Sequence, residues 1–152
     1  MEVNIIALGT LKNGPYFDAI KMYEKRLHWN VSLTILESKK NTAIEKAKDE
    51  HQKILNALDS SAYTIALDER GKTISSSQFA DQFLKLQNQG RSKIQIIIGG
   101  ADGLNDENRN KCDFLLSFGA QTWPHMLVRV MLYEQLYRAQ QILNGHPYHR
   151  DS

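Results

Sequence analysis

The feature that most constrains the fold is an alternation of short apolar runs with longer segments of helical periodicity. Five runs predict strands, at residues Val3–Leu8, Val31–Leu36, Ala62–Leu67, Ile94–Ile98 and Phe114–Phe118. Between and after them, apolar residues recur every three or four positions, which predicts amphipathic helices. Such alternation is typical of an α/β fold, with a mainly parallel sheet sandwiched by helices. Short connections without a linker or repeat predict a single domain over residues 1–152.

Local signals mark where several helices begin and end. Thr42 with Glu45, and Ser75 with Gln78, have the spacing of capping boxes. Asn144-Gly145 is expected to stop the last helix, which should begin near Leu127. The apolar face of the second helix is predicted to contain Ile44, Ala47, Ile54, Leu55 and Leu58.

Composition excludes several classes of protein. A chain of 152 residues that is 41% hydrophobic and 24% charged can bury a core without disulfide staples. No apolar run approaches the roughly 20 residues of a membrane span, so no membrane association is expected. The single cysteine and the absence of a signal-peptide pattern at Met1–Gly9 favour the cytoplasm. A net charge of +2 permits a nucleic-acid partner without predicting one.

In parallel sheets, ligands bind outside the carboxyl ends of the strands, so the segments that follow the strands are the informative ones. Gly9–Gly14 has the glycine spacing of a phosphate-binding loop but lacks the lysine and hydroxyl that should follow, which favours a simple turn. Asp68–Lys72 is either a solvated turn or a pocket edge, in which Leu67 forms a wall and the basic residues contact RNA.

Two later segments are stronger candidates for ligand binding. Gly99–Gly103 carries three glycines, which suit close main-chain contacts to a nucleoside, although a plain turn would also use them. Ser117–His125 is too long for a tight turn, and its backbone could clamp a small ligand. Two alternatives stay open there: Trp123 as a core residue, and His125 as a structural histidine before the last helix.

The C-terminal segment His146-Pro147-Tyr148-His149-Arg150 combines groups that can stack on a base and hold phosphate. A frayed end is the alternative, because terminal residues are often disordered. A zinc site is not expected, since the two histidines lack further ligands at a useful spacing. Serine-hydrolase and zinc-protease motifs are absent, and Cys112 is expected to be a packed thiol. Positioning of a cofactor therefore fits better than hydrolysis.

Taken together, these motifs resemble the RlmH family, the ribosomal RNA large-subunit pseudouridine N3-methyltransferases of the SPOUT class. The resemblance covers the whole chain in order, spacing and length. The segments that carry it are Ile5–Gly9, Leu67-Asp68, Ile98–Leu104, Leu115–Phe118, Thr122–His125, Val128–Val130, Glu134–Ala139 and His146–Arg150.

The resemblance implies an α/β knot of the SPOUT type, with a C-terminal trefoil knot, and a homodimer. It implies S-adenosylmethionine as cofactor and N3 of a pseudouridine in 23S ribosomal RNA as target. The implied cofactor-binding residues are Leu67, Gly99, Phe118, Gly119, Ala120, Gln121, Thr122 and Trp123. No metal is implied.

The chemistry of the transfer suggests which residues act. A proton acceptor for the base N3 is expected among His125, Tyr148 and His149, whereas Arg129, Arg138 and Arg150 are expected to stabilise negative charge. The tail should form the RNA side of the site. Because one small subunit has little surface for reading sequence, the assembled ribosome is the expected substrate.

Three other interpretations remain at this stage. A knotted binding module would hold RNA or a nucleotide without catalysis. A flavodoxin-like protein would show the same βα alternation, but Gly9–Gly14 offers no hydroxyl cluster beyond Thr10. A structural dimer without a ligand would leave the glycines and the tail unexplained.

Overall fold

The computed structural model describes residues 1–100 and 102–150, so that Ala101 of the glycine-rich segment lies outside the described residues. The described strands are β1 (Glu2–Leu8), β2 (Asn30–Leu36), β3 (Tyr63–Thr73), β4 (Lys93–Ile98) and β5 (Phe114–Ser117). The described helices are α1 (Pro15–Arg26), α2 (Ala43–Ala57), α3 (Ser76–Asn88), α4 (Asp106–Asn110) and α5 (His125–Leu143).

The strands form one sheet in the order β2-β1-β4-β3-β5, and every neighbouring pair is parallel. This confirms the predicted α/β fold with a parallel sheet. The order also decides where loops meet: the carboxyl ends of β4, β3 and β5 lie next to one another, although the segments that follow them are far apart in sequence.

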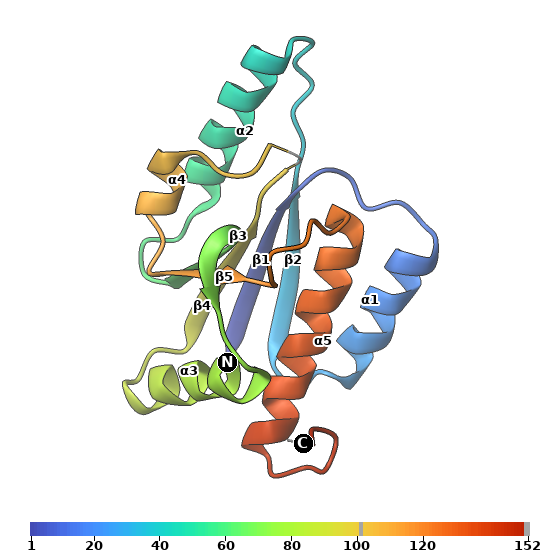
Figure 1. Cartoon of the computed structure of the whole chain (residues 1–152), viewed down its shortest axis with the longest axis vertical. Helices are drawn as coiled ribbons and strands as arrows, with labels where there is room; N and C mark the ends of the chain where they lie inside the picture. Colours follow the sequence, from blue (N-terminus) through green and yellow to red (C-terminus); the bar gives the residue numbers. More distant parts are fainter. Residues whose placement is uncertain (101, 151–152) are drawn as a thin grey trace.

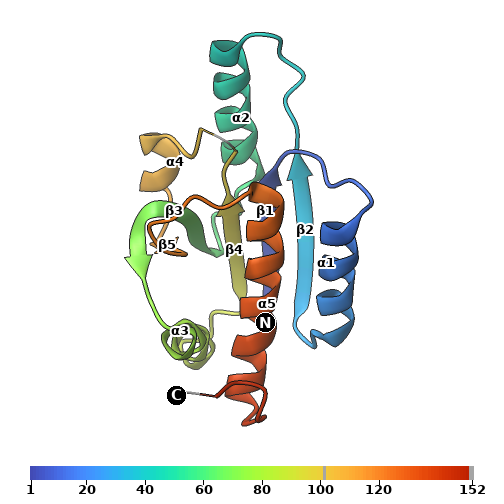
Figure 2. The same cartoon turned by 45° about the vertical axis from the view of Figure 1, so that its right-hand side comes forward.

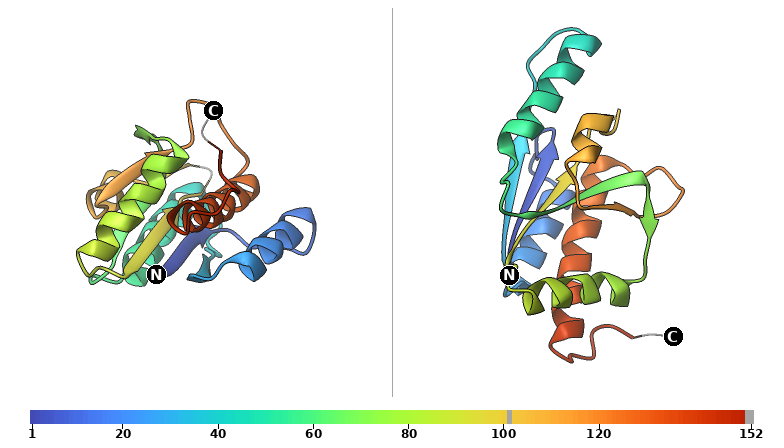
Figure 3. Two further views of the ribbon diagram at one scale, coloured as in Figure 1. Left: turned by 90° about the horizontal axis from the view of Figure 1, so that it is seen from below. Right: turned by 90° about the vertical axis from the view of Figure 1, so that its left-hand side faces the viewer.

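Helices cover both faces of the sheet (Figures 1 and 2). Helices α1, α3 and α5 share one face, where α5 packs between the other two. Helices α2 and α4 lie on the other face, and α2 projects beyond the carboxyl ends of the strands (Figure 3). Side chains along the strands alternate between the two faces. Ile65 and Ile96 belong to the core under α1, α3 and α5, whereas Ala66 and Ile97 belong to the smaller core under α2.

Most helix boundaries agree with the sequence. Ser75 and Gln78 form both bonds of a capping box, and at the start of α2 the Thr42 hydroxyl accepts from the Glu45 N–H. Two expectations were wrong in detail. Helix α5 begins at His125, two residues before the predicted start, and Ile44 is 72% exposed rather than part of the apolar face of α2. The first turn of α2 extends past the sheet and has no core to contact.

Helix α5 is 19 residues long and carries much of the core on one side, where Leu132, Tyr133 and Leu136 are fully buried. The same helix buries two polar side chains, Arg129 and Gln140. Gln140 accepts hydrogen bonds from the backbone N–H groups of the α1–β2 connection, so it ties α5 to that loop. Within residues 1–100 and 102–150, no helix has the length and apolar character needed to cross a membrane.

The largest departure from the sequence analysis concerns β3. The segment Asp68–Lys72, expected to lie beyond the strand as a solvated turn or a pocket edge, belongs to β3 itself, which runs on to Thr73. The pairing with β5 is interrupted between Leu67 and Lys72, so these charged residues form a bulge that bends the strand. Gly71 sits where the bulge crosses β5, and a Cβ there would lie 2.5 Å from the Leu115 carbonyl.

We expect Gly71→Ala to destabilise the protein, because its methyl group would overlap the backbone of β5. Overpacking of this kind costs about 1–3 kcal/mol. Urea unfolding followed by circular dichroism measures the change, with Lys72→Ala as the control, since Lys72 is the exposed neighbour. Equal midpoints for the two variants would show that β3 and β5 are not in contact at this point.

Candidate functional site

A cavity of about 290 Å³ lies at the carboxyl ends of β3, β4 and β5. Its walls come from the bulge of β3, the segment after β4, the β5–α5 loop and the first turn of α5. Its lining includes Leu67, Gly99, Phe118, Gly119, Gln121, Thr122 and Trp123. These are the residues predicted to bind the cofactor, except Ala120, which is exposed and does not line the cavity. The strand order therefore brings the predicted residues together.

The backbone around the cavity is shaped by glycine. Gly103 and Gly119 have φ values of +73° and +107°, a region that other residues rarely adopt. A Cβ on either would meet no atom within 4 Å, so backbone conformation rather than crowding explains both glycines. At Gly99 the reason is crowding, since a Cβ would lie 3.2 Å from Gly103 and from Leu104. Main-chain groups can thus approach a ligand from two sides.

The β5–α5 loop is held by its own hydrogen bonds. The Ser117 hydroxyl accepts from Gly119 N and donates to Gly119 O, both at 3.1 Å. The Trp123 indole donates to the Phe118 carbonyl at 3.2 Å, and the side chain is 38% exposed. The interpretation of Trp123 as a core residue is therefore wrong. Its ring is available at the edge of the cavity.

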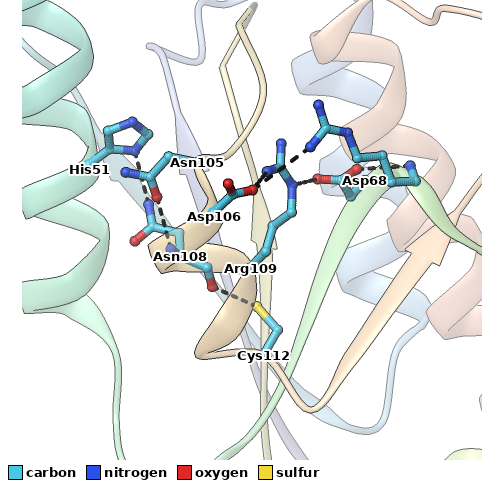
Figure 4. Close-up of polar contacts among 8 residues, drawn as sticks. His51, Asp68, Asn105, Asp106, Asn108, Arg109 and Cys112 are labelled. Carbon is cyan, nitrogen blue, oxygen red and sulfur yellow. Dashed lines mark hydrogen bonds and ion pairs between the residues drawn. The ribbon is translucent and has the colours of Figure 1, made fainter.

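An ion pair that the sequence analysis did not anticipate lies in the cavity wall. The Arg109 Nε donates to Asp68 Oδ2 at 2.8 Å, and their side chains are only 15% and 6% exposed (Figure 4). The hydrogen bond that Arg109 donates to Asp68 raises the pKa of Arg109 above its ordinary value. Asp68 belongs to the Leu67-Asp68 motif of the sequence analysis, but only the fold shows that its partner comes from α4.

Two predicted catalytic residues lie on the first turns of α5 and differ in surroundings. His125 is half-buried and lines the cavity. Arg129 is fully buried and points elsewhere: its Nη2 donates to the carbonyls of Leu8 and Gly9, at 2.8 and 2.7 Å. Burial lowers the pKa of Arg129. In the structure Arg129 holds the end of β1 against α5, and its expected action on the RNA stays a prediction.

The C-terminal tail is anchored to α5, so the interpretation of a frayed end is wrong for residues 146–149. The Tyr148 hydroxyl donates to Glu134 at 3.1 Å, and its ring meets Tyr137 edge-on with 4.8 Å between centroids. Arg138 donates twice to the same Glu134 and lies over the Tyr148 ring. Burial, followed by the nearby Glu134, raises the pKa of Tyr148 to about 12.

His149 is held in the same cluster. Its Nδ1 lies 3.1 Å from Arg138 Nη1, and its Nε2 lies 3.5 Å from the Ser77 hydroxyl. Because a guanidinium only donates, Nδ1 must accept, which places the ring proton of a neutral His149 on Nε2. Arg150 is exposed. Over residues 1–100 and 102–150, no three His, Cys, Asp or Glu side chains gather as metal ligands would.

The tail follows the C-terminal end of α5 (Figure 1), whereas the cavity is lined by His125 and Val128 near the N-terminal end of the helix. Glu134, which binds Tyr148, comes nine residues after His125. At 1.5 Å per residue this separates the two positions by about 14 Å along the helix axis. The structure thus brings the predicted cofactor residues together but does not bring the tail to them within one chain.

A second hollow, of about 430 Å³, lies on the α3–α5 side of the sheet. Apolar side chains dominate its lining, which includes Ile74, Phe79, Leu116, Phe118, Val130 and Met131. Glu134, the anchor of the tail, also lines it. Leu116, Ser117 and Phe118 line both cavities, so the end of β5 is the partition between them.

A family model described as "Predicted SPOUT methyltransferase" matches residues 1–149. The chain belongs to the SPOUT methyltransferase family. A curated relative from Rhodospirillum centenum, named ribosomal RNA large subunit methyltransferase H, is 46% identical and is aligned over 99% of both chains. A relative of the same name from Zymomonas mobilis is 42% identical over the same share. The resemblance read from the sequence is confirmed.

Solved structures support the fold of this SPOUT methyltransferase. A probable methylase family protein from Haemophilus influenzae superposes with a TM-score of 0.61 at 15% identity, covering 98% of this chain and 70% of the other. The SpoU methyltransferase AviRb from Streptomyces viridochromogenes has a TM-score of 0.50 at 12% identity, covering 95% and 61%. At this identity the likeness concerns the fold alone. The trefoil knot implied by the family stays a prediction.

Cys112, the only cysteine, lies just after α4. It is half-buried, and its thiol donates to the Asn108 carbonyl at 3.3 Å. Burial and nearby carboxylates raise its pKa to about 11. At pH 8 we expect its reaction with a disulfide reagent to be about a hundredfold slower than in the unfolded chain, because only the thiolate reacts. Absorbance kinetics in buffer and in guanidinium measure the ratio, and equal rates would mean that the thiol is accessible.

Proposed function

We propose that this SPOUT methyltransferase uses S-adenosylmethionine to methylate N3 of a pseudouridine in 23S ribosomal RNA, in the cytoplasm. The observation that carries the proposal is that Leu67, Gly99 and the Phe118–Trp123 loop enclose one cavity at the carboxyl edge of the sheet. The relatives' name, ribosomal RNA large subunit methyltransferase H, supports the substrate class.

The chemistry of the cavity fits an adenosyl group. Leu67, Phe118 and Val128 offer apolar surface for a flat base, and the glycine-rich backbone on two sides offers main-chain donors and acceptors for its polar edge. The cofactor supplies a methyl group that its sulfonium has already activated. Leu67, Gly99 and residues 118–123 would hold it, with Ala120 contributing through its backbone.

The chain's own contribution is to orient the target base and to accept its imide proton. Orientation can supply on the order of 7–11 kcal/mol of the barrier, and a general base adds about 10²–10⁴-fold. Among the three expected acceptors, Tyr148 is disfavoured because its hydroxyl donates to Glu134 and its pKa is about 12. His125 in the cavity wall and His149 in the tail remain, but Nδ1 of His149 already accepts from Arg138, so His149 could take the proton only by giving up that bond.

We further propose that a complete site needs two subunits. Reacting atoms must come within about 3–3.5 Å, whereas the tail is anchored at Glu134, about 14 Å along α5 from His125 in the cavity of its own chain. A second copy related by a two-fold axis can present its tail to this cavity. Val130 and Met131 are only partly buried and line the apolar hollow between α3 and α5, which offers a surface for such a homodimer.

The decisive experiment is methyl transfer from labelled S-adenosylmethionine to ribosomes from cells that lack this protein. We expect one labelled nucleotide, identified by mass as an N3-methylated pseudouridine in large-subunit RNA. Assembled ribosomes should be methylated better than a short naked hairpin, and equal activity on both would contradict the proposed ribosomal substrate. Calorimetry with the cofactor tests the binding-module interpretation, which absence of binding would favour.

Truncation after Gly145 should abolish methylation without affecting cofactor binding, because it removes the tail and leaves the cavity intact. A mixed dimer tests the composite site. Truncated chains and Gly99→Val chains, each inactive alone, should regain about a quarter of wild-type activity when randomly paired, since half of the dimers then hold one complete site of two. No recovery in verified mixed dimers would place tail and cavity of the same subunit together.

A further inference from the structure

Helix α4 contains five residues, Asp106–Asn110, too few to be stable without outside contacts. Its N-terminus is capped by Asn105, whose side chain accepts from Asn108 N at 2.9 Å. Beyond that cap, side-chain links tie the helix to two different elements (Figure 4). The position of α4 therefore depends on those links more than on its own helical bonds.

On one side α4 is tied to α2. Asn108 is fully buried, and its Nδ2 lies 3.1 Å from Nδ1 of His51. On the other side it is tied to β3 by the Asp68–Arg109 ion pair in the cavity wall. Asp68 uses its second oxygen to accept from Arg70 N at 2.9 Å, so the same carboxylate also shapes the bulge of β3.

The glycine-rich segment connects the end of β4 to α4, so its position depends on where α4 is held. It leaves β4 at Ile98 and reaches the cap of α4 at Asn105, and within it Gly103 N donates to Gly100 O at 3.0 Å. Leu104 is buried and packs on Gly99. A shift of α4 would therefore move Leu104, and with it Gly99 and the cavity wall.

Resting on the proposed function, we propose that Asp68 and Arg109 act as a pair of positioning residues for the adenosyl cofactor. Their ion pair fixes the distance between β3 and α4, and so holds the glycine-rich segment in the form that binds the cofactor. Both side chains line the cavity, but their mutual hydrogen bond leaves neither charge free for an independent contact. Loss of either partner should weaken cofactor binding.

Calorimetric titration of the wild type, Asp68→Asn, Arg109→Met and the double variant with S-adenosylmethionine tests the pair. We expect each single change to raise the cofactor Kd about tenfold, and the double change to be no worse than the worse single one, because coupled residues are not additive. Asp106→Asn is the matched control. It removes the charge of the other carboxylate that Arg109 binds, and should change Kd less than about twofold because the Asp106 side chain is 89% exposed.

Enzyme kinetics separate positioning from general damage. The KM for the cofactor should rise with the Kd, while kcat at saturating cofactor changes much less. The melting temperature of the free protein should fall in the single variants, because each leaves a largely buried charge unpaired, so Kd and KM are measured well below the melting temperature of every variant. Arg109→Lys, which keeps the charge but not the planar fork, should fall between the wild type and Arg109→Met. If Arg109→Met does not fold, Arg109→Lys replaces it in the titration.

The outcomes distinguish this inference from the proposed function. Wild-type protein that binds no cofactor would overturn the proposed function. Wild-type binding with unchanged Kd in the single variants, or with additive losses in the double variant, would overturn the positioning pair alone.

Discussion

The site depends on the parallel pairing of β3 between β4 and β5. Parallel strands end at the same edge of a sheet, so this order places the glycine-rich segment, the β3 bulge and the β5–α5 loop around one space. Those three segments are separated by tens of residues in the chain. Strand order thus decides where the cavity lies, and the side chains that link the surrounding segments hold its walls in place.

Buried arginines secure the loops around that edge. Arg129 joins α5 to the end of β1 through two carbonyl acceptors, and Arg109 joins α4 to β3 through a carboxylate. The two cations are compensated differently. Asp68 neutralises Arg109. Arg129 instead donates to two carbonyl oxygens, and among the residues that the structure describes its Nε and Nη1 are buried without a hydrogen-bond partner. Burying a cation costs free energy. The benefit of Arg129 therefore lies in joining α5 to the end of β1 rather than in added stability.

Strand and helix positions, the parallel sheet and the loops of the cavity could be predicted, because periodicity and glycine placement are local signals. The β3 bulge could not: Asp68–Lys72 looks like a solvated turn until Gly71 is seen crossing β5. The partners of Arg109 and Arg129 were also beyond prediction, because each pair joins elements distant in sequence. The tail is anchored by Glu134, and the sequence indicated only that Glu134 belongs to a family motif, not that Tyr148 would bind it.

One consequence follows from the way α5 carries a cavity residue in its first turn and the tail's anchor further along. The length of helix between His125 and Glu134 fixes the distance between the cavity and the anchor of the tail. Inserting one residue between His125 and Glu134 would add about 1.5 Å and rotate everything beyond it by about 100°. The spacing along α5 is therefore fixed by geometry, whereas the connection between β2 and α2, which is clear of both functions, can change in length at little cost.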